Sequence, residues 1–190
     1  MRRVVWIVVA AGALLLALDF RARLQPVYHG PPGAKPLVIE GTPGPALAFS
    51  IPVASLQSGL VTLAPPPEGL VIHYWATWNR ESAAEIAALD SLVRSGQCPA
   101  QVVAVTADPM PSVARYARRR HITLAILLDP GRALEPVAPL KAIPSTYVFD
   151  ARGRLLVYRE GPVDWWAPRT LETLRRASRV ALERGPLPAS

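Results

Sequence analysis

Hydrophobic and polar positions follow two kinds of pattern along the chain. Short, nearly continuous apolar runs occupy residues 69–75, 100–107, 124–128 and 145–150, and such runs are typical of strands that are covered on both faces. Residues 80–95 instead repeat apolar positions at helical spacing, with charges on the opposite side, which predicts an amphipathic helix. The first pattern therefore predicts a central sheet, and the second predicts a helix that packs on it.

Turn and capping residues predict the remaining elements. Asp108 and Pro109 are a good N-cap and first-turn pair, so we expect a helix from here to about Arg120. A last helix is expected from about Pro168 to Arg184, before a Gly-Pro pair that would end it. Further strands are predicted at residues 46–51, 60–63 and 154–160. This order predicts an α/β fold with a central mixed β-sheet flanked by helices on both faces.

The first residues have the pattern of a membrane anchor. Two arginines follow Met1, and residues 4–18 are an uncharged apolar run. As a helix this run is about 22 Å long, somewhat short of the ~30 Å hydrocarbon core. No convincing cleavage site follows it, so we predict that residues 1–24 are an uncleaved single-pass anchor in the cytoplasmic membrane. A cleaved signal peptide is the alternative, and either interpretation places the rest of the chain in the periplasm.

The chain after the anchor divides by composition. Residues 25–45 are rich in proline and glycine and predict an extended linker. Residues 46–185 hold the predicted strands and helices of one domain, and residues 186–190 form a tail. The net charge is +7, but export from the cytoplasm argues against nucleic acid as a partner. The oligomeric state is left open.

A resemblance to a known family rests on several separate short matches. Residues 46–184 resemble the thioredoxin fold, and more narrowly the membrane-anchored, extracytoplasmic thiol-disulfide oxidoreductases of the TlpA/ResA type. The matching pieces are Trp75-Ala76-Thr77-Trp78, Glu85, Leu128-Asp129-Pro130, Ile143-Pro144-Ser145-Thr146, the Asp150 to Gly153 hairpin, and the segment from Gly161 through Asp164 and Trp165. The resemblance implies a thioredoxin-like domain.

The chain departs from this family at the positions that carry its chemistry. The family has Cys-x-x-Cys after the tryptophan, whereas this chain has Asn79-Arg80-Glu81-Ser82. Disulfide exchange needs a thiolate. Neither an amide nor an alcohol can supply one, so we predict no catalytic residue at this corner. No cysteine and histidine spacing fits a zinc site, and we predict no metal and no cofactor.

The resemblance also implies a groove for an extended peptide. Pro144 matches the family's cis-proline, which faces the active-site corner and lies beside the bound peptide chain. The candidate groove is formed by Trp78, Asn79, Arg80, Glu81, Ser82, Ile143 and Pro144. The alternative is that Pro144 only shapes the fold.

His73 and Glu85 are predicted to be buried polar residues near this groove. We expect His73 to hydrogen-bond Ser82 in the core. A hydrolase with Ser82 as nucleophile and His73 as base is a weaker alternative, because no oxyanion hole is evident.

Two functions follow from these residues. The first is a non-catalytic module that binds an extended peptide or an envelope protein partner in a thiol-disulfide or cytochrome c biogenesis pathway. The second is a thiol-disulfide oxidoreductase that acts through Cys98, the single cysteine, or through a partner's thiols. Cys98 lies after the first predicted helix, about 20 Å from the corner, so we expect it to be a packed or partly exposed thiol.

Overall fold

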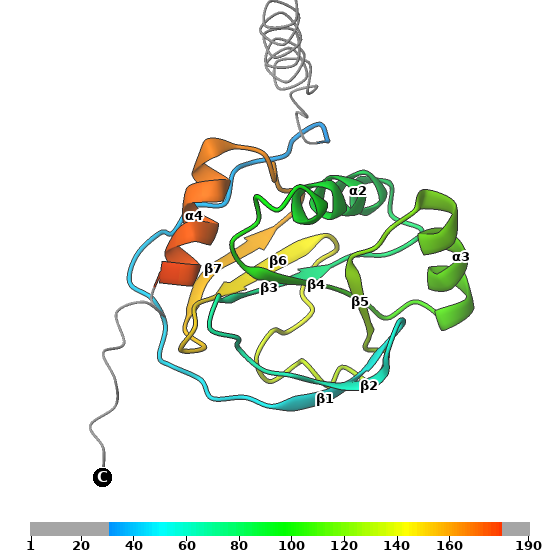
Figure 1. Ribbon diagram of the computed structural model, residues 1–190, viewed down its shortest axis with the longest axis horizontal. Coiled ribbons are helices and arrows are strands. Elements are labelled where there is room, and N and C mark those ends of the chain that lie inside the picture. The colour runs from blue at the N-terminus through cyan, green and yellow to red at the C-terminus, as the bar shows by residue number, and fades with distance from the viewer. Residues whose placement is uncertain (1–30, 180–190) are drawn as a thin grey trace, which may run out of the picture.

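The computed structural model describes residues 31–179 (Figure 1). The predicted anchor at residues 1–24, the first part of the linker and the tail at residues 186–190 lie outside the described residues. The described elements are β1 (Ile51–Ser55), β2 (Gly59–Leu63), β3 (Leu70–Tyr74), α2 (Arg80–Arg94), β4 (Gln101–Thr106), α3 (Met110–Arg120), β5 (Ala125–Leu128), β6 (Ser145–Phe149), β7 (Leu155–Glu160) and α4 (Pro168–Arg179).

The strands form one mixed sheet of seven strands in the order β2-β1-β5-β4-β3-β6-β7. β3, β4 and β5 pair in parallel, whereas β6, β7, β1 and β2 join by antiparallel pairing. The sequence patterns explain the centre of the sheet, since every residue of β3 and of β6 is buried. The predicted mixed α/β fold is confirmed.

The three described helices lie on one face of the sheet, so the prediction of helices on both faces is wrong (Figure 1). Ile86 of α2, Val113 of α3 and Leu174 of α4 belong to the same hydrophobic cluster. The reason is topological. The chain steps from β3 to β4 to β5 in one direction across the sheet, and because both crossovers are right-handed, α2 and α3 lie on the same side.

The opposite face of the sheet is covered by a long connection rather than by a helix. Leu134 and Ala138, from the segment between β5 and β6, pack on this face together with Phe149. The hydroxyl group of Tyr74 donates a 2.7 Å hydrogen bond to the carbonyl oxygen of Ala138. The Asp129 carboxylate accepts hydrogen bonds from the backbone that follows it, which holds the first turn of the segment.

The first predicted strand is displaced in the structure. Residues 46–51 were expected to form it, whereas β1 begins at Ile51 and includes Pro52. Proline disfavours the interior of a strand because it cannot donate to the ladder. Here β1 pairs with β5 only at Ala54 and Ser55, so no strand of the described chain pairs with Pro52 on that side. The missing N–H therefore breaks no hydrogen bond.

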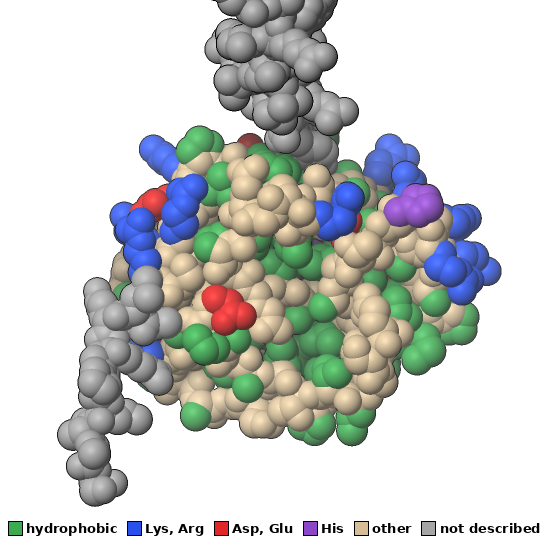
Figure 2. All heavy atoms as spheres, viewed as in Figure 1, with side chains coloured by type: hydrophobic (Ala, Val, Ile, Leu, Met, Phe, Trp, Pro, Cys, Tyr) green, Lys and Arg blue, Asp and Glu red, His purple; other side chains and the backbone are tan. Residues whose placement is uncertain are grey.

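Two groups of arginines stand out on the face of the molecule that Figure 2 shows. Figure 2 shows arginines gathered over α3 at one side and over α4 at the other. Arg118, Arg119 and Arg120 form the last turn of α3, and all three are exposed. Within residues 31–179, no helix has the length and apolar character needed to cross a bilayer.

Candidate functional site

The corner between β3 and α2 begins with Asn79, which is the N-cap of the helix. Its backbone is extended, with φ −89° and ψ 121°, and its Oδ1 atom accepts a 2.9 Å hydrogen bond from the Ser82 N–H. Its Nδ2 atom donates a 3.3 Å hydrogen bond to the carbonyl oxygen of Ile143. One amide side chain thus satisfies a free N–H at the helix end and also joins the corner to the next loop.

The loop that faces this corner contains a cis peptide bond between Ile143 and Pro144. Sheet pairing places the loop here, because Tyr74 at the end of β3 lies opposite Ser145 at the start of β6. The carbonyl oxygen of Pro144 accepts a 2.9 Å hydrogen bond from the Gly161 N–H. The Ile143 N–H has no hydrogen-bond partner among the described residues, so one backbone donor beside the corner is free.

Trp78 is the exposed apolar side chain of the corner, with 71% of its surface accessible. Its Nε1 atom donates a 3.2 Å hydrogen bond to Oδ1 of Asp108. The other carboxylate oxygen of Asp108 accepts hydrogen bonds of 2.7 Å from both the N–H and the hydroxyl group of Thr77. The indole ring is therefore held in solvent by a fixed carboxylate, and an ordered aromatic side chain of this kind is typical of binding surfaces.

The contacts of Asp108 also correct a prediction. Asp108 was expected to cap α3, but the N-cap of α3 is Pro109, which makes no side-chain capping bond. The Asp108 carboxylate is instead turned towards Thr77 and Trp78. The sequence pattern identified the end of β4 correctly. It could not show that Thr77 and Trp78, at the end of a different strand, donate hydrogen bonds to the Asp108 carboxylate.

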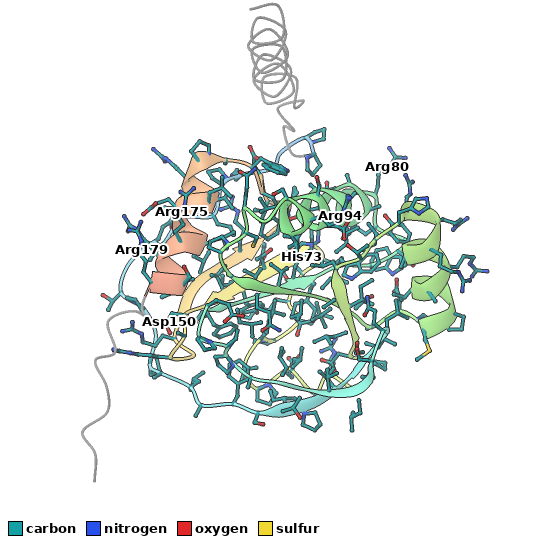
Figure 3. All side chains as sticks on the ribbon, viewed as in Figure 1. His73, Arg80, Arg94, Asp150, Arg175 and Arg179 are labelled. Atoms are coloured by element: carbon teal, nitrogen blue, oxygen red, sulfur yellow. The ribbon has the colours of Figure 1, made fainter. Side chains whose placement is uncertain are left out.

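The other candidate groove residues differ in exposure. Arg80 and Glu81 are exposed at the first turn of α2, and Figure 3 shows the Arg80 side chain pointing away from the body of the molecule. Ser82, in the first turn of α2, is fully buried. The surface at the corner is therefore formed by Trp78, Arg80 and Glu81, with Asn79 and Ile143 half-buried behind them.

A buried polar cluster lies beneath α2, where Figure 3 shows His73. Nδ1 of His73 is 3.0 Å from the Thr146 hydroxyl group and 3.9 Å from Oε1 of Glu85. The same Glu85 oxygen accepts hydrogen bonds from the Val163 N–H at 2.8 Å and from Nε1 of Trp165 at 3.1 Å. All of these side chains come from different elements, so the cluster connects the helix to β3, to β6 and to the segment before α4.

Within the part of the chain that the structure describes, three polar atoms in and beside this cluster have no hydrogen-bond partner: His73 Nε2, Ser82 Oγ and Glu85 Oε2. The predicted hydrogen bond between His73 and Ser82 is absent, because Nδ1 of His73 contacts Thr146 instead. The hydrolase alternative loses its support here. A nucleophilic serine needs a base within hydrogen-bonding distance and access to substrate, and the buried Ser82 hydroxyl group has neither.

Burial keeps both titratable groups of the cluster neutral. Desolvation raises the pKa of Glu85 from 4.5 to about 8, although the hydrogen bonds from Val163 and Trp165 oppose the shift and the negative charge of Glu81 adds to it. Desolvation lowers the pKa of His73 from 6.5 to about 3. At pH 7 the cluster therefore contains a protonated carboxyl group beside a neutral imidazole.

Cys98 lies far from this corner. It follows the C-terminal end of α2, and a helix of 15 residues is about 22 Å long. The Sγ atom of Cys98 donates a 3.4 Å hydrogen bond to the carbonyl oxygen of Ala100, and burial raises the pKa of the thiol. The thiolate form needed for disulfide exchange is therefore disfavoured. Within residues 31–179, no cluster of His, Cys, Asp or Glu side chains could hold a metal ion.

Comparison with solved structures identifies the fold. StoA from Bacillus subtilis matches with a TM-score of 0.57 and 16% identity, covering 70% of this chain and 99% of its own. A putative thiol:disulfide interchange protein DsbE from Chlorobium tepidum matches with a TM-score of 0.54 and 19% identity, covering 75% and 98%. Peroxiredoxin Q from Xanthomonas campestris matches with a TM-score of 0.58 and 19% identity, covering 76% and 99%.

These matches show a thioredoxin-like fold. No protein-family model matches the chain, and no curated protein matches it at the level of sequence. The likeness therefore shows the fold alone, and the solved proteins that share this fold include thiol:disulfide interchange proteins and peroxiredoxins. At the corner where the resemblance places two cysteines, this chain has Asn79 and Ser82.

Proposed function

We propose that this protein is a membrane-anchored, extracytoplasmic thioredoxin-like module that binds an extended peptide of a partner and exchanges no disulfide with it. The observation that carries the proposal is the composition of the corner. Trp78 is exposed and held by Asp108 beside the Ile143–Pro144 loop, while Asn79 and Ser82 occupy the thiol positions implied by the family resemblance. The narrower resemblance to the TlpA/ResA type belongs to the same proposal.

The peptide would contact this corner in two ways. The indole face of Trp78 offers apolar area whose position is already fixed, which lowers the entropic cost of binding. The free N–H of Ile143 can donate to a carbonyl oxygen of an extended chain, as in other modes of recognition by backbone pairing. The Ile143 carbonyl oxygen already accepts a hydrogen bond from Asn79. Pairing with the backbone of the peptide would therefore rely mainly on the Ile143 N–H.

The chemistry of the corner argues against catalysis. Asn79 has no ionisable proton and serves as a helix cap, and Ser82 is buried without a base. The alternative of an oxidoreductase acting through Cys98 requires a reactive thiolate, but burial raises the pKa of this thiol and α2 separates it from the corner. Binding is the function that remains for the exposed residues.

The location of the module is part of the proposal. The apolar run at residues 4–18 supports an anchor in the cytoplasmic membrane, and the following domain would then face the periplasm. Two structural neighbours are described as thiol:disulfide interchange proteins, so we propose a partner in an envelope thiol-disulfide or cytochrome c biogenesis pathway.

A crosslinking experiment tests the binding surface. A photoreactive phenylalanine replaces Trp78 in the full-length protein, which is irradiated in its native envelope. Leu47 is the matched control, because it is also an exposed apolar residue but lies beside Gly153, at the far end of β6 from the corner. We expect discrete adducts from position 78 and none from position 47. Equal labelling at both positions, or none at either, would contradict a peptide surface at this corner.

A further inference from the structure

The two edge strands of the sheet differ in whether other segments of the chain cover them. β7 is one edge, and the segment before β1 runs along it. The Lys35 N–H donates a 3.1 Å hydrogen bond to the carbonyl oxygen of Pro162, and the Lys35 carbonyl oxygen accepts a 3.0 Å hydrogen bond from the Asp164 N–H. Further along the same segment, the N–H groups of Gly44 and Leu47 donate hydrogen bonds to the carbonyl oxygens of Leu155 and Gly153, in the hairpin that β6 and β7 form. Backbone from the same chain thus covers both ends of this edge, which is a common protection against unwanted pairing.

β2 is the other edge, and it has no such cover. It pairs with β1 over its whole length, from Gly59 opposite Ser55 to Leu63 opposite Ile51. No strand or isolated bridge of the described chain pairs with its outer side. The side chain of Leu60 has 76% of its surface exposed. An edge strand with free backbone groups is a template for another strand.

The way in which β1 pairs with its two neighbouring strands shows which backbone groups of β2 point outward. Residues that face each other in an antiparallel pair alternate between pairs that exchange two hydrogen bonds and pairs that exchange none. The Leu56 N–H donates to Ile126 on the β5 side, and because backbone groups alternate along a strand, those of Ala54 and Pro52 also face away from β2. The pairs of Pro52 with Thr62 and of Ala54 with Leu60 are therefore of the second kind. The N–H and C=O groups of Leu60 and Thr62 therefore point away from β1, towards solvent.

The charge pattern of this edge favours a second copy of the same chain. The chain contains no charged residue between Glu40 and Glu68, although its net charge is +7. The exposed edge also lacks the lysine or glutamate that usually blocks strand addition. Figure 2 shows the side of the molecule below the sheet, over β1 and β2, free of blue, red and purple side chains. Two copies would repel each other through their helical layers and least through this hairpin.

We propose that two copies of this protein pair antiparallel through β2. A two-fold axis at Val61 places Leu60 opposite Thr62 of the partner subunit, and the outward groups of these residues then form four hydrogen bonds across the axis. Val61 meets its own copy as the pair without hydrogen bonds, where the Cα atoms are about 4.5 Å apart. The two sheets become one continuous sheet. This pairing is independent of the peptide surface at Trp78.

A cysteine placed on the axis tests the register directly. The full-length protein carries Cys98→Ser and Val61→Cys, and its membranes are exposed to a mild oxidant. Cα atoms about 4.5 Å apart lie within the range of a disulfide, so we expect most of the chain to become a covalent dimer. The matched control is Ser58→Cys, an exposed position in the same hairpin. Its copy across the axis would be about 20 Å away, so it should form no dimer.

A second variant distinguishes disulfides formed in the proposed register from disulfides formed by random collision. Leu60→Lys in the Val61→Cys background leaves β1 and β2 intact, because the Leu60 side chain is exposed, but it puts a positive charge on each copy beside the axis. We expect the yield of covalent dimer to fall at least tenfold. Equal dimer yields from positions 58 and 61, an unchanged yield with Leu60→Lys, or no dimer from position 61 would each overturn the proposed pairing.

Discussion

Replacing Glu85 by glutamine tests the account of the buried polar cluster. The Oε1 atom that accepts from the Val163 N–H and from Trp165 is kept in this variant. The atom that changes is Oε2, which has no hydrogen-bond partner among residues 31–179. Glutamine has nearly the same shape as glutamate but cannot ionise. The substitution therefore removes the titration of Glu85 while leaving the packing beneath α2 in place.

The expected effect on stability depends on pH, and its sign follows from the direction of the pKa shift. Burial raises the pKa of Glu85 from 4.5 to about 8. Between these values the unfolded chain is ionised at this residue while the folded protein keeps the proton, so ionisation favours unfolding and the free energy of unfolding decreases as pH rises. One pKa unit corresponds to about 1.4 kcal/mol, so the decrease from pH 5 to pH 8 is about 3 kcal/mol.

His73 contributes with the opposite sign in a different window. Burial lowers its pKa from 6.5 to about 3, so the unfolded chain gains a proton below pH 6.5 and the folded protein does not. This contribution destabilises the protein as pH falls. Between pH 4.5 and 6.5 the two contributions oppose each other, and above pH 6.5 only that of Glu85 remains.

Urea unfolding of both proteins, followed by the fluorescence of the buried tryptophans Trp75 and Trp165, measures this difference from pH 5 to pH 8. Since His73 is present in both proteins, its contribution largely cancels. We expect the free energy of unfolding of Glu85→Gln relative to the original protein to rise by about 3 kcal/mol across this range. A constant difference would mean that Glu85 is ionised in the folded protein, and the reasoning about the cluster would then be wrong.

Three other substitutions have defined outcomes. Asn79→Ala removes the cap of α2 and the bond to the Pro144 loop, so it should lower the free energy of unfolding by about 2 kcal/mol, whereas Asn79→Asp should recover about half of this loss. Asp90→Ala leaves the buried N–H of Leu124 and two partly buried donors of Thr123 without their acceptor and should cost about 3 kcal/mol by urea unfolding. Asp108→Ala releases Trp78 and should lower its fluorescence anisotropy, a change that Asp108→Asn should largely prevent.

The sequence predicts most of the fold because the strongest signals are local. The apolar runs that became β3 and β6 are buried at every position, and the spacing of residues 80–95 predicts α2 to within one residue. The placement of the helices could not be read in the same way. It depends on the order of strands in space, in which β5 lies between β4 and β1, so that the chain moves in one direction across the sheet from β3 to β5.

The sequence also predicts part of the candidate site. The resemblance to the thioredoxin fold predicted that the proline loop faces the corner at Trp78, and the pairing of β3 with β6 brings these two segments together. The contacts that organise the corner are long-range, such as Asn79 with Ile143 and Asp108 with Trp78. A polar residue that caps a helix and one that crosses to another loop have the same local pattern, so sequence spacing could not assign these partners.

The insulin-reduction assay tests the central claim most directly, because it measures disulfide exchange itself. The account predicts that the purified protein leaves the rate of insulin reduction by dithiothreitol unchanged, and that Cys98→Ser makes no difference. Acceleration of insulin reduction that is lost in Cys98→Ser would contradict it, because the protein would then be transferring electrons through its single thiol.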